Sequence, residues 1–160
     1  LQGCNARMSE IHAALGLAQL ERFDAALAAR RELGAVYVEQ LRVLEEVEVP
    51  AAIAAGQTNF QSLVVVLSEN LDRNRVIGEL LKADVESTVA GFAISTQEAF
   101  EGVDAVGPTP NSLRLDRFGL ALPIHENMRE KDVHKVVEAL KRVILEQRSV
   151  RGQSEVMRGK

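Results

Sequence analysis

The amino-acid sequence predicts an α+β fold, in which helices lie beside a small mixed or antiparallel sheet. Three patterns carry that prediction. Apolar residues recur at steps of three and four over residues 8–44, which is the period of an α-helix. Residues 60–67 (FQSLVVVL) include a β-branched, apolar run that is typical of a buried strand. Another amphipathic helix follows Asn127, with Glu130 placed as in a capping box.

The composition fits one globular domain of 160 residues, with 46% hydrophobic and 26% charged residues. A net charge of -4 argues against nucleic acid as a partner and against a polybasic membrane-surface protein. The single cysteine, Cys4, excludes an internal disulfide and a multi-cysteine zinc site. The three histidines, His12, His125 and His134, are too scattered to indicate a metal site.

The two ends of the chain raise a question about its completeness. The sequence begins at Leu1 without the apolar segment of a signal peptide, and no apolar run reaches the ~18 residues of a membrane span. We therefore expect a cytoplasmic protein, and we expect this sequence to be part of a longer gene product. Residues 148–160 are charged and lack periodicity, so they predict a disordered tail.

The helical region at residues 8–44 is longer than a typical globular helix, so we expect a break. Ser9 is a suitable N-cap, and the apolar face changes phase near Arg22–Ala25, which favours a break there. The segment Ala13–Ala29 is rich in small residues. It would allow close approach of a partner helix, or equally it would pack within the chain.

The middle of the chain alternates short strands and helices. Residues 91–110 are rich in glycine and proline and predict a long loop, either a binding segment or a plain surface connection. The other expected elements are strands at 47–50, 60–67 and 85–89, a helix at 71–82 capped by Asn70, a short helix at 111–118, and an extended segment at 120–124 interrupted by Pro123.

Chemistry is indicated at three places, none of them strong alone. Asn5 and Arg7 precede a helix N-terminus, where free N–H groups favour an anion such as phosphate; a plain cap with a surface arginine explains them as well. His125 follows Pro123 and is either a cleft residue or a structural histidine. Ser95 and Gln97 lie in the long loop and would suit a sugar-like substrate.

These segments together resemble the pyridoxal-phosphate-dependent sugar aminotransferases of the DegT/DnrJ/EryC1/StrS family. The resemblance covers residue 3 to about residue 145 and is most specific at its start. It rests on the following segments: Asn5-Ala6-Arg7-Met8-Ser9-Glu10-Ile11, Ala13 to Leu20, Arg30-Arg31 with Tyr37 and Leu41, Asn111 to Arg114, Leu122-Pro123-Ile124-His125, Met128, Asp132-Val133 and Val136-Val137.

The resemblance implies the small C-terminal domain of a fold-type I enzyme that uses pyridoxal phosphate. Asn5 and Arg7 would then bind the cofactor phosphate in a site shared across a homodimer. Ser95, Gln97 and His125 would lie on the substrate side, where an amino acid donates an amino group to a nucleotide-linked keto-sugar. The family's Schiff-base lysine precedes the segment equivalent to Gly3, so we expect this chain alone to be inactive.

The domain organisation follows from the same resemblance. Residues 1–44 would be an interdomain helical segment, residues 45–147 the small domain, and residues 148–160 the tail. Two other interpretations remain: a non-catalytic dimerisation or structural module, and a family member with altered chemistry such as sugar dehydration.

Overall fold

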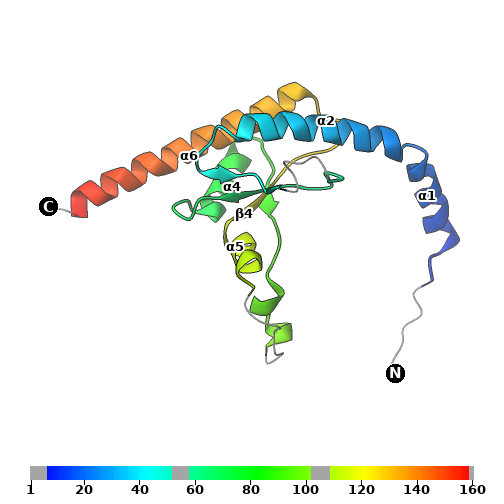
Figure 1. Ribbon diagram of the computed structural model, residues 1–160, viewed down its shortest axis with the longest axis horizontal. Helices are drawn as coiled ribbons and strands as arrows, with labels where there is room; N and C mark the ends of the chain where they lie inside the picture. Colours follow the sequence, from blue (N-terminus) through cyan, green and yellow to red (C-terminus); the bar gives the residue numbers. More distant parts are fainter. Residues whose placement is uncertain (1–6, 52–57, 102–108, 159–160) are drawn as a thin grey trace.

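The computed structural model describes residues 7–51, 58–101 and 109–158, with side chains to residue 150 (Figure 1). The α+β prediction is confirmed: a small antiparallel sheet lies against helices. The elements in chain order are α1 (Glu10–Leu20), α2 (Phe23–Leu41), β1 (Val47–Glu48), β2 (Leu63–Leu67), α4 (Arg73–Lys82), β3 (Thr88–Val89), the short helices η1 (Ile94–Thr96) and η2 (Glu98–Phe100), α5 (Pro110–Phe118), β4 (Gly119–Leu122) and α6 (Glu130–Arg158).

The sheet has the strand order β1-β2-β4-β3, and every neighbouring pair is antiparallel. Leu63 pairs with Leu122 and Val65 with Leu120, so these four side chains share one face. All four are at most 4% exposed and belong to the main core, which α2, α4 and α6 cover. α5 lies below the sheet, away from α2 and α6 (Figure 1).

The helices that cover the core begin where side chains or turns satisfy their first N–H groups. Asp72, rather than the expected Asn70, caps α4 by accepting from the Arg75 N–H at 3.1 Å. Leu71 is buried, so the chain must first turn inward before α4 can start. α6 also begins later than Asn127, at Glu130, because residues 125–128 form a turn. The Asp132 carboxylate then accepts from the Arg129 N–H at 2.8 Å.

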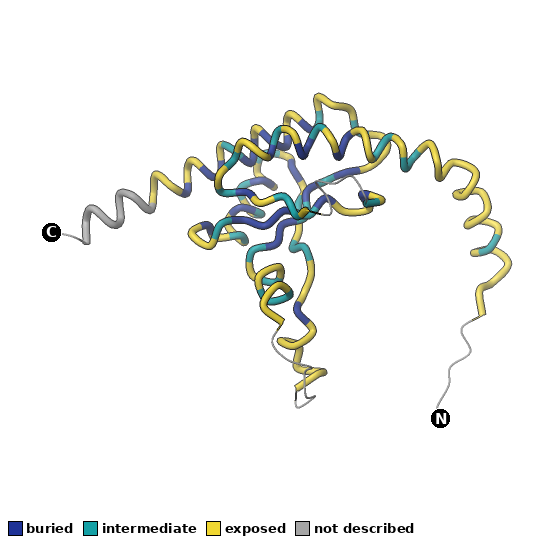
Figure 2. The backbone as a smooth tube through the Cα atoms, viewed as in Figure 1, coloured by how far each residue is buried: buried dark blue, intermediate teal, exposed yellow. Residues whose placement is uncertain are grey.

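The expected break in the long helical region is confirmed at Glu21 and Arg22, between α1 and α2. Ser9 caps α1 as predicted, and its hydroxyl accepts from the His12 N–H. No residue of α1 is buried; Ile11 is 80% exposed. Figure 2 shows α1 as a mostly exposed segment that leads away from the core. Packing of α1 into the core of the described part of the chain is therefore not observed.

α2 packs closely against the segment before β2 at Gly34, which has no side chain. Phe60, which is 2% exposed, places its ring where a Gly34 side chain would be: a Cβ there would lie 2.4 Å from Phe60 Cε1. Phe60 adopts φ 49°, a left-handed conformation that is unusual for a bulky residue. The Thr58 hydroxyl accepts from the Phe60 N–H at 3.0 Å and supports this turn. β2 consequently begins at Leu63 rather than at residue 60.

α6 continues through Arg158, into residues for which the sequence predicts a disordered tail. Gln147 is 8% exposed and connects α6 to the start of α4. Its Oε1 accepts from the Asp72 N–H at 3.0 Å, and its Nε2 donates to the Asp72 carbonyl at 3.2 Å. Arg148 forms an ion pair with Glu46. These contacts hold the helix to the domain up to about residue 148.

Substitution of Gly34 by alanine should destabilise the domain by about 1–3 kcal/mol, because the new methyl group overlaps the Phe60 ring. Gly78→Ala is the matched control, since Gly78 is an exposed helix residue at which an added Cβ would meet no neighbouring atom within 4 Å. That substitution should stabilise by roughly 0.5–1 kcal/mol. Urea unfolding measures both; equal effects of the two substitutions would contradict the Phe60 contact.

Candidate functional site

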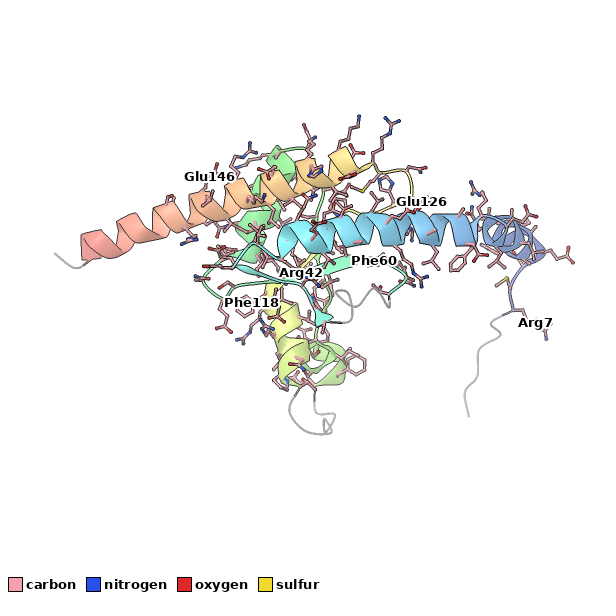
Figure 3. The ribbon with its side chains drawn as sticks, turned by 45° about the horizontal axis from the view of Figure 1, so that its top comes forward. Arg7, Arg42, Phe60, Phe118, Glu126 and Glu146 are labelled. Carbon is pink, nitrogen blue, oxygen red and sulfur yellow. The ribbon has the colours of Figure 1, made fainter. Side chains whose placement is uncertain are left out.

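The predicted phosphate-binding residues lie at the free end of α1. Asn5 is outside the described residues. Arg7 is exposed and makes no ion pair with a described residue. Figure 3 shows it beyond the start of α1, at the opposite end of the molecule from Glu146. The neighbouring Ser9 hydroxyl accepts from the His12 backbone N–H at 3.4 Å, so this end of α1 is already partly capped.

Ser95 and Gln97 lie in an arm formed by residues 92–101 and 109–118, which extends below the sheet (Figure 1). Both side chains contribute to holding the arm together. The Ser95 and Thr109 hydroxyls are 3.3 Å apart, and Gln97 Nε2 donates to the Thr96 hydroxyl at 3.3 Å. The Thr96 hydroxyl in turn donates to the Asp116 carboxylate at 3.2 Å. Ser95 and Gln97, the two predicted sugar-binding residues, are thus exposed, and both form hydrogen bonds within the arm.

Two side-chain hydrogen bonds, together with the packing of α5 on β2 and β4, attach the arm to the rest of the domain. Arg114 of α5 pairs with Glu48 of β1 at 2.6 Å, and this hydrogen bond lowers the pKa of the Glu48 carboxyl. Arg73 of α4 donates to the Asp116 carbonyl. The arm also exposes large apolar side chains, Phe92 (70%) and Ile94 (63%) among them. Sequence patterns do not predict this apolar surface, because single apolar residues in a polar loop carry no periodic signal.

His125 lies in the turn between β4 and α6, and its side chain is exposed. Two side chains of α2 hold this turn on either side of it. The Tyr37 hydroxyl donates to the Pro123 carbonyl at 2.8 Å. Arg30 donates to Glu126 Oε2 through Nε at 3.1 Å and through a terminal nitrogen at 2.9 Å. The backbone N–H of Glu126 and the Arg30 guanidinium both lower the pKa of the Glu126 carboxyl.

A groove of about 820 Å³ lies beside this turn, between the start of α2, residues 59–61 and residues 126–127. It combines amide side chains, the Arg30–Glu126 ion pair and the half-exposed ring of Phe23. Asn59 and Gln61 reach it because they flank Phe60, whose backbone conformation turns the chain there. No sequence pattern predicts the groove, because its walls are far apart along the chain.

The described residues do not bring the predicted site residues together. Arg7 lies beyond the start of α1, the Ser95–Gln97 segment lies in the arm below the sheet, and the His125 turn lies against α2 (Figures 1 and 3). Within residues 7–51, 58–101 and 109–158, no group of three His, Cys, Asp or Glu side chains could hold a metal ion. Over the same ranges, no helix has the length and apolar character of a membrane span.

The lysines also argue against a complete cofactor site in the described residues. Lys82 and Lys141 pair with Glu79 and Glu138 on helix surfaces, and Lys131 and Lys135 lie exposed on α6. A covalently bound pyridoxal phosphate needs an enclosed lysine. These four lysines lie on open helix surfaces, so none of them provides that enclosure.

The Tyr37 contact with the turn can be tested by alkaline titration. Burial, aided by the Asp132 carboxylate, raises the pKa of the Tyr37 phenol. The contribution of the protonated Tyr37 phenol to folding stability is therefore complete below pH ~10, the pKa of a tyrosine in the unfolded chain. This contribution is lost as the pH rises from there through the raised pKa of the folded state. Tyr37 is the only tyrosine and tryptophan is absent, so phenolate absorption reports it alone. We expect no phenolate near pH ~10 in the folded chain but a midpoint there in urea; the same midpoint in both would contradict the buried contact.

Comparison with known proteins identifies the family. The sequence profile of the DegT/DnrJ/EryC1/StrS aminotransferase family matches residues 1–141. GDP-perosamine synthase of Caulobacter vibrioides is 33% identical over 146 residues, which are 89% of this chain and 39% of that protein. The putative pyridoxal phosphate-dependent aminotransferase EpsN of Bacillus subtilis is 29% identical over 86% of this chain and 36% of its own length. The chain thus spans less than half the length of these relatives.

Solved structures agree with the sequence comparison. The structure of DesI in the presence of its TDP-sugar product superposes with a TM-score of 0.79 at 29% identity, over 96% of this chain and 40% of that one. The putative sugar aminotransferase Spr1654 of Streptococcus pneumoniae shares the fold, with a TM-score of 0.78 at 21% identity over 91% of this chain and 37% of its own. The chain belongs to the DegT/DnrJ/EryC1/StrS aminotransferase family.

Proposed function

We propose that this chain is the C-terminal portion of an aminotransferase that moves an amino group from an amino acid to a nucleotide-linked keto-sugar. The observation that carries the proposal is the superposition on DesI, whose structure was determined with a TDP-sugar product, over 96% of this chain. The family match over residues 1–141 supports the same activity. Pyridoxal phosphate would supply the chemistry by acting as an electron sink.

The chain would contribute residues at the edges of the active site rather than its centre. Asn5 and Arg7 are proposed to bind the cofactor phosphate, since a guanidinium and an amide suit an oxyanion. Ser95, Gln97 and His125 are proposed to face the sugar. The start of α1, the arm and the His125 turn lie apart within the domain. This separation supports a site completed by other parts of the protein, including a second subunit. We further propose that the protein is a cytoplasmic homodimer.

The proposed domain boundaries follow from this assignment. Residues 1–44 would connect the cofactor-binding domain to the small domain at 45–147. The largely exposed apolar side chains of α1, such as Ile11 and Leu17, support a partner surface that α1 covers in the whole protein. The same observation favours one alternative: that this chain serves only as a dimerisation or structural module. Catalysis by the complete protein distinguishes the two.

The activity is tested by expressing the complete coding sequence and supplying pyridoxal phosphate, an amino-acid donor and a nucleotide-linked keto-sugar. We expect the absorption band of lysine-bound cofactor and transfer of the amino group to the sugar. Replacement of the cofactor-binding lysine should abolish both, and the 160-residue chain alone should show neither. A complete protein that contains the lysine but never shows the band would overturn the proposal.

The proposed role of Asn5 leads to a second test in the complete protein. Asn5→Ala should weaken cofactor retention by roughly 1–3 kcal/mol, because a hydrogen bond to a charged phosphate is lost. Asn74→Ala is the matched control, since Asn74 is exposed on α4, away from any predicted site. Cofactor release measured by equilibrium dialysis compares the two variants. Equal retention by both would remove Asn5 from the phosphate site.

A further inference from the structure

The turn that carries His125 is held by one face of α2. Arg30, Gly34 and Tyr37 are four and three residues apart, so they share a face of the helix. Each makes a different contact: Arg30 with Glu126, Gly34 with the Phe60 ring, and Tyr37 with Pro123. His125 lies between the two residues of the turn that Arg30 and Tyr37 bind.

Tyr37 fixes the point at which the chain leaves the sheet. Pairing between β2 and β4 ends at Leu122, and Pro123 has no N–H with which to extend it. The Pro123 carbonyl instead accepts from the Tyr37 hydroxyl at 2.8 Å. Because Tyr37 is 0% exposed and its ring is packed in the core, the hydroxyl has little freedom to move. Pro123, which directly precedes Ile124 and His125, is therefore fixed in place by a side chain of the core.

Arg30 fixes the other side of the turn. Two of its nitrogens donate to the same Glu126 oxygen, at 2.9 and 3.1 Å, which restricts the direction of approach. The side chains are 29% and 40% exposed, so this pair is a surface contact and contributes little stability by itself. Its geometric effect is to orient Glu126, and with it the backbone next to His125.

His125 differs from the other two histidines because its ring makes no hydrogen bond to a described side chain, although it acts electrostatically on the neighbouring Glu126 carboxyl. His12 Nδ1 is 2.7 Å from the Ser9 hydroxyl, and His134 Nε2 is 3.5 Å from Glu130. The His125 carbonyl accepts from the Met128 N–H at 3.0 Å, which closes the turn. Among the described residues, no side chain hydrogen bonds to the His125 imidazole. The backbone is held on both sides while the ring remains exposed to solvent.

We propose that Tyr37 and Arg30 are positioning residues: by holding the chain on both sides of His125, they place this residue where its imidazole can contact the sugar substrate. This rests on the proposed function, in which His125 faces the sugar. Tyr37 acts through the Pro123 carbonyl and Arg30 through the Glu126 carboxylate. The Phe60 ring against Gly34 prevents α2 from sliding, so both contacts keep their registry with the turn.

The geometric part is tested on the 160-residue chain by NMR of the histidine rings. Tyr37→Phe and Arg30→Gln should each shift the His125 ring signals and the amide signals of the turn. The His12 and His134 rings lie on other elements and should not move. Arg42→Gln is the matched control, because Arg42 lies exposed at the other end of α2. Unshifted His125 signals in both folded variants would overturn the proposal.

The functional part is tested by kinetics of the complete enzyme. Tyr37→Phe and Arg30→Gln should each raise KM for the keto-sugar about five- to tenfold, as expected for one disturbed hydrogen bond. KM for the amino donor should stay unchanged. In a His125→Ala background, adding Tyr37→Phe should raise the sugar KM no further, since the positioned ring is gone. A purely structural role of Tyr37 predicts the same added effect in both backgrounds and would contradict the proposal.

The two proposals fail in distinguishable ways. A wild-type enzyme that transfers no amino group to any keto-sugar overturns the proposed function and the substrate role of His125. An active wild-type enzyme whose sugar KM is unaffected by both variants overturns the positioning role alone. If Tyr37→Phe does not fold, the surface variant Arg30→Gln still decides the question, and Arg30→Lys shows whether the paired geometry or the charge alone is required.

Discussion

The arrangement of this domain depends on the contact between one face of α2 and two distant turns. The Phe60 ring occupies the space above Gly34, and Tyr37 reaches from the core to the Pro123 carbonyl. These contacts connect α2 to the segments that enter β2 and leave β4, the two central strands of the sheet. α2 therefore joins the sheet, the His125 turn and, through the break at Arg22, the exposed helix α1.

Two parts of the chain, α1 and the arm below the sheet, lie outside the core and expose apolar side chains. α1 has no buried residue, and the arm below the sheet exposes Phe92 and Ile94. Exposed apolar side chains that lie together on one element favour a surface that a partner covers. The chain spans 39% of the length of GDP-perosamine synthase and 36% of EpsN, so related proteins contain much more structure than is present here. These features support the proposal that the domain supplies the edges of an active site that other parts of the protein complete.

Local features of the fold followed from the sequence, whereas long-range ones did not. The Ser9 cap, the break near Arg22 and the amphipathic character of α6 depend on neighbours a few residues away, and short-range patterns describe them well. The Asn70 and Asn127 caps were wrong because burial of Leu71 and the turn at His125 delay both helices. The Tyr37–Pro123 contact spans 86 residues, and the φ of Phe60 depends on Gly34. No single-sequence pattern encodes such pairs. Local residue chemistry and motif resemblance were enough to select the candidate site residues, whereas the support of the His125 turn by α2 depends on contacts between distant segments.

The most direct test of the proposed site is a crystal structure of the complete protein with a nucleotide-linked sugar bound. We expect the His125 imidazole to contact the sugar while the Tyr37 hydroxyl still donates to the Pro123 carbonyl and Arg30 still binds Glu126. We also expect α1 and the arm to be covered by protein. A structure in which the sugar binds far from His125, or in which the turn has left α2, would contradict the proposed site.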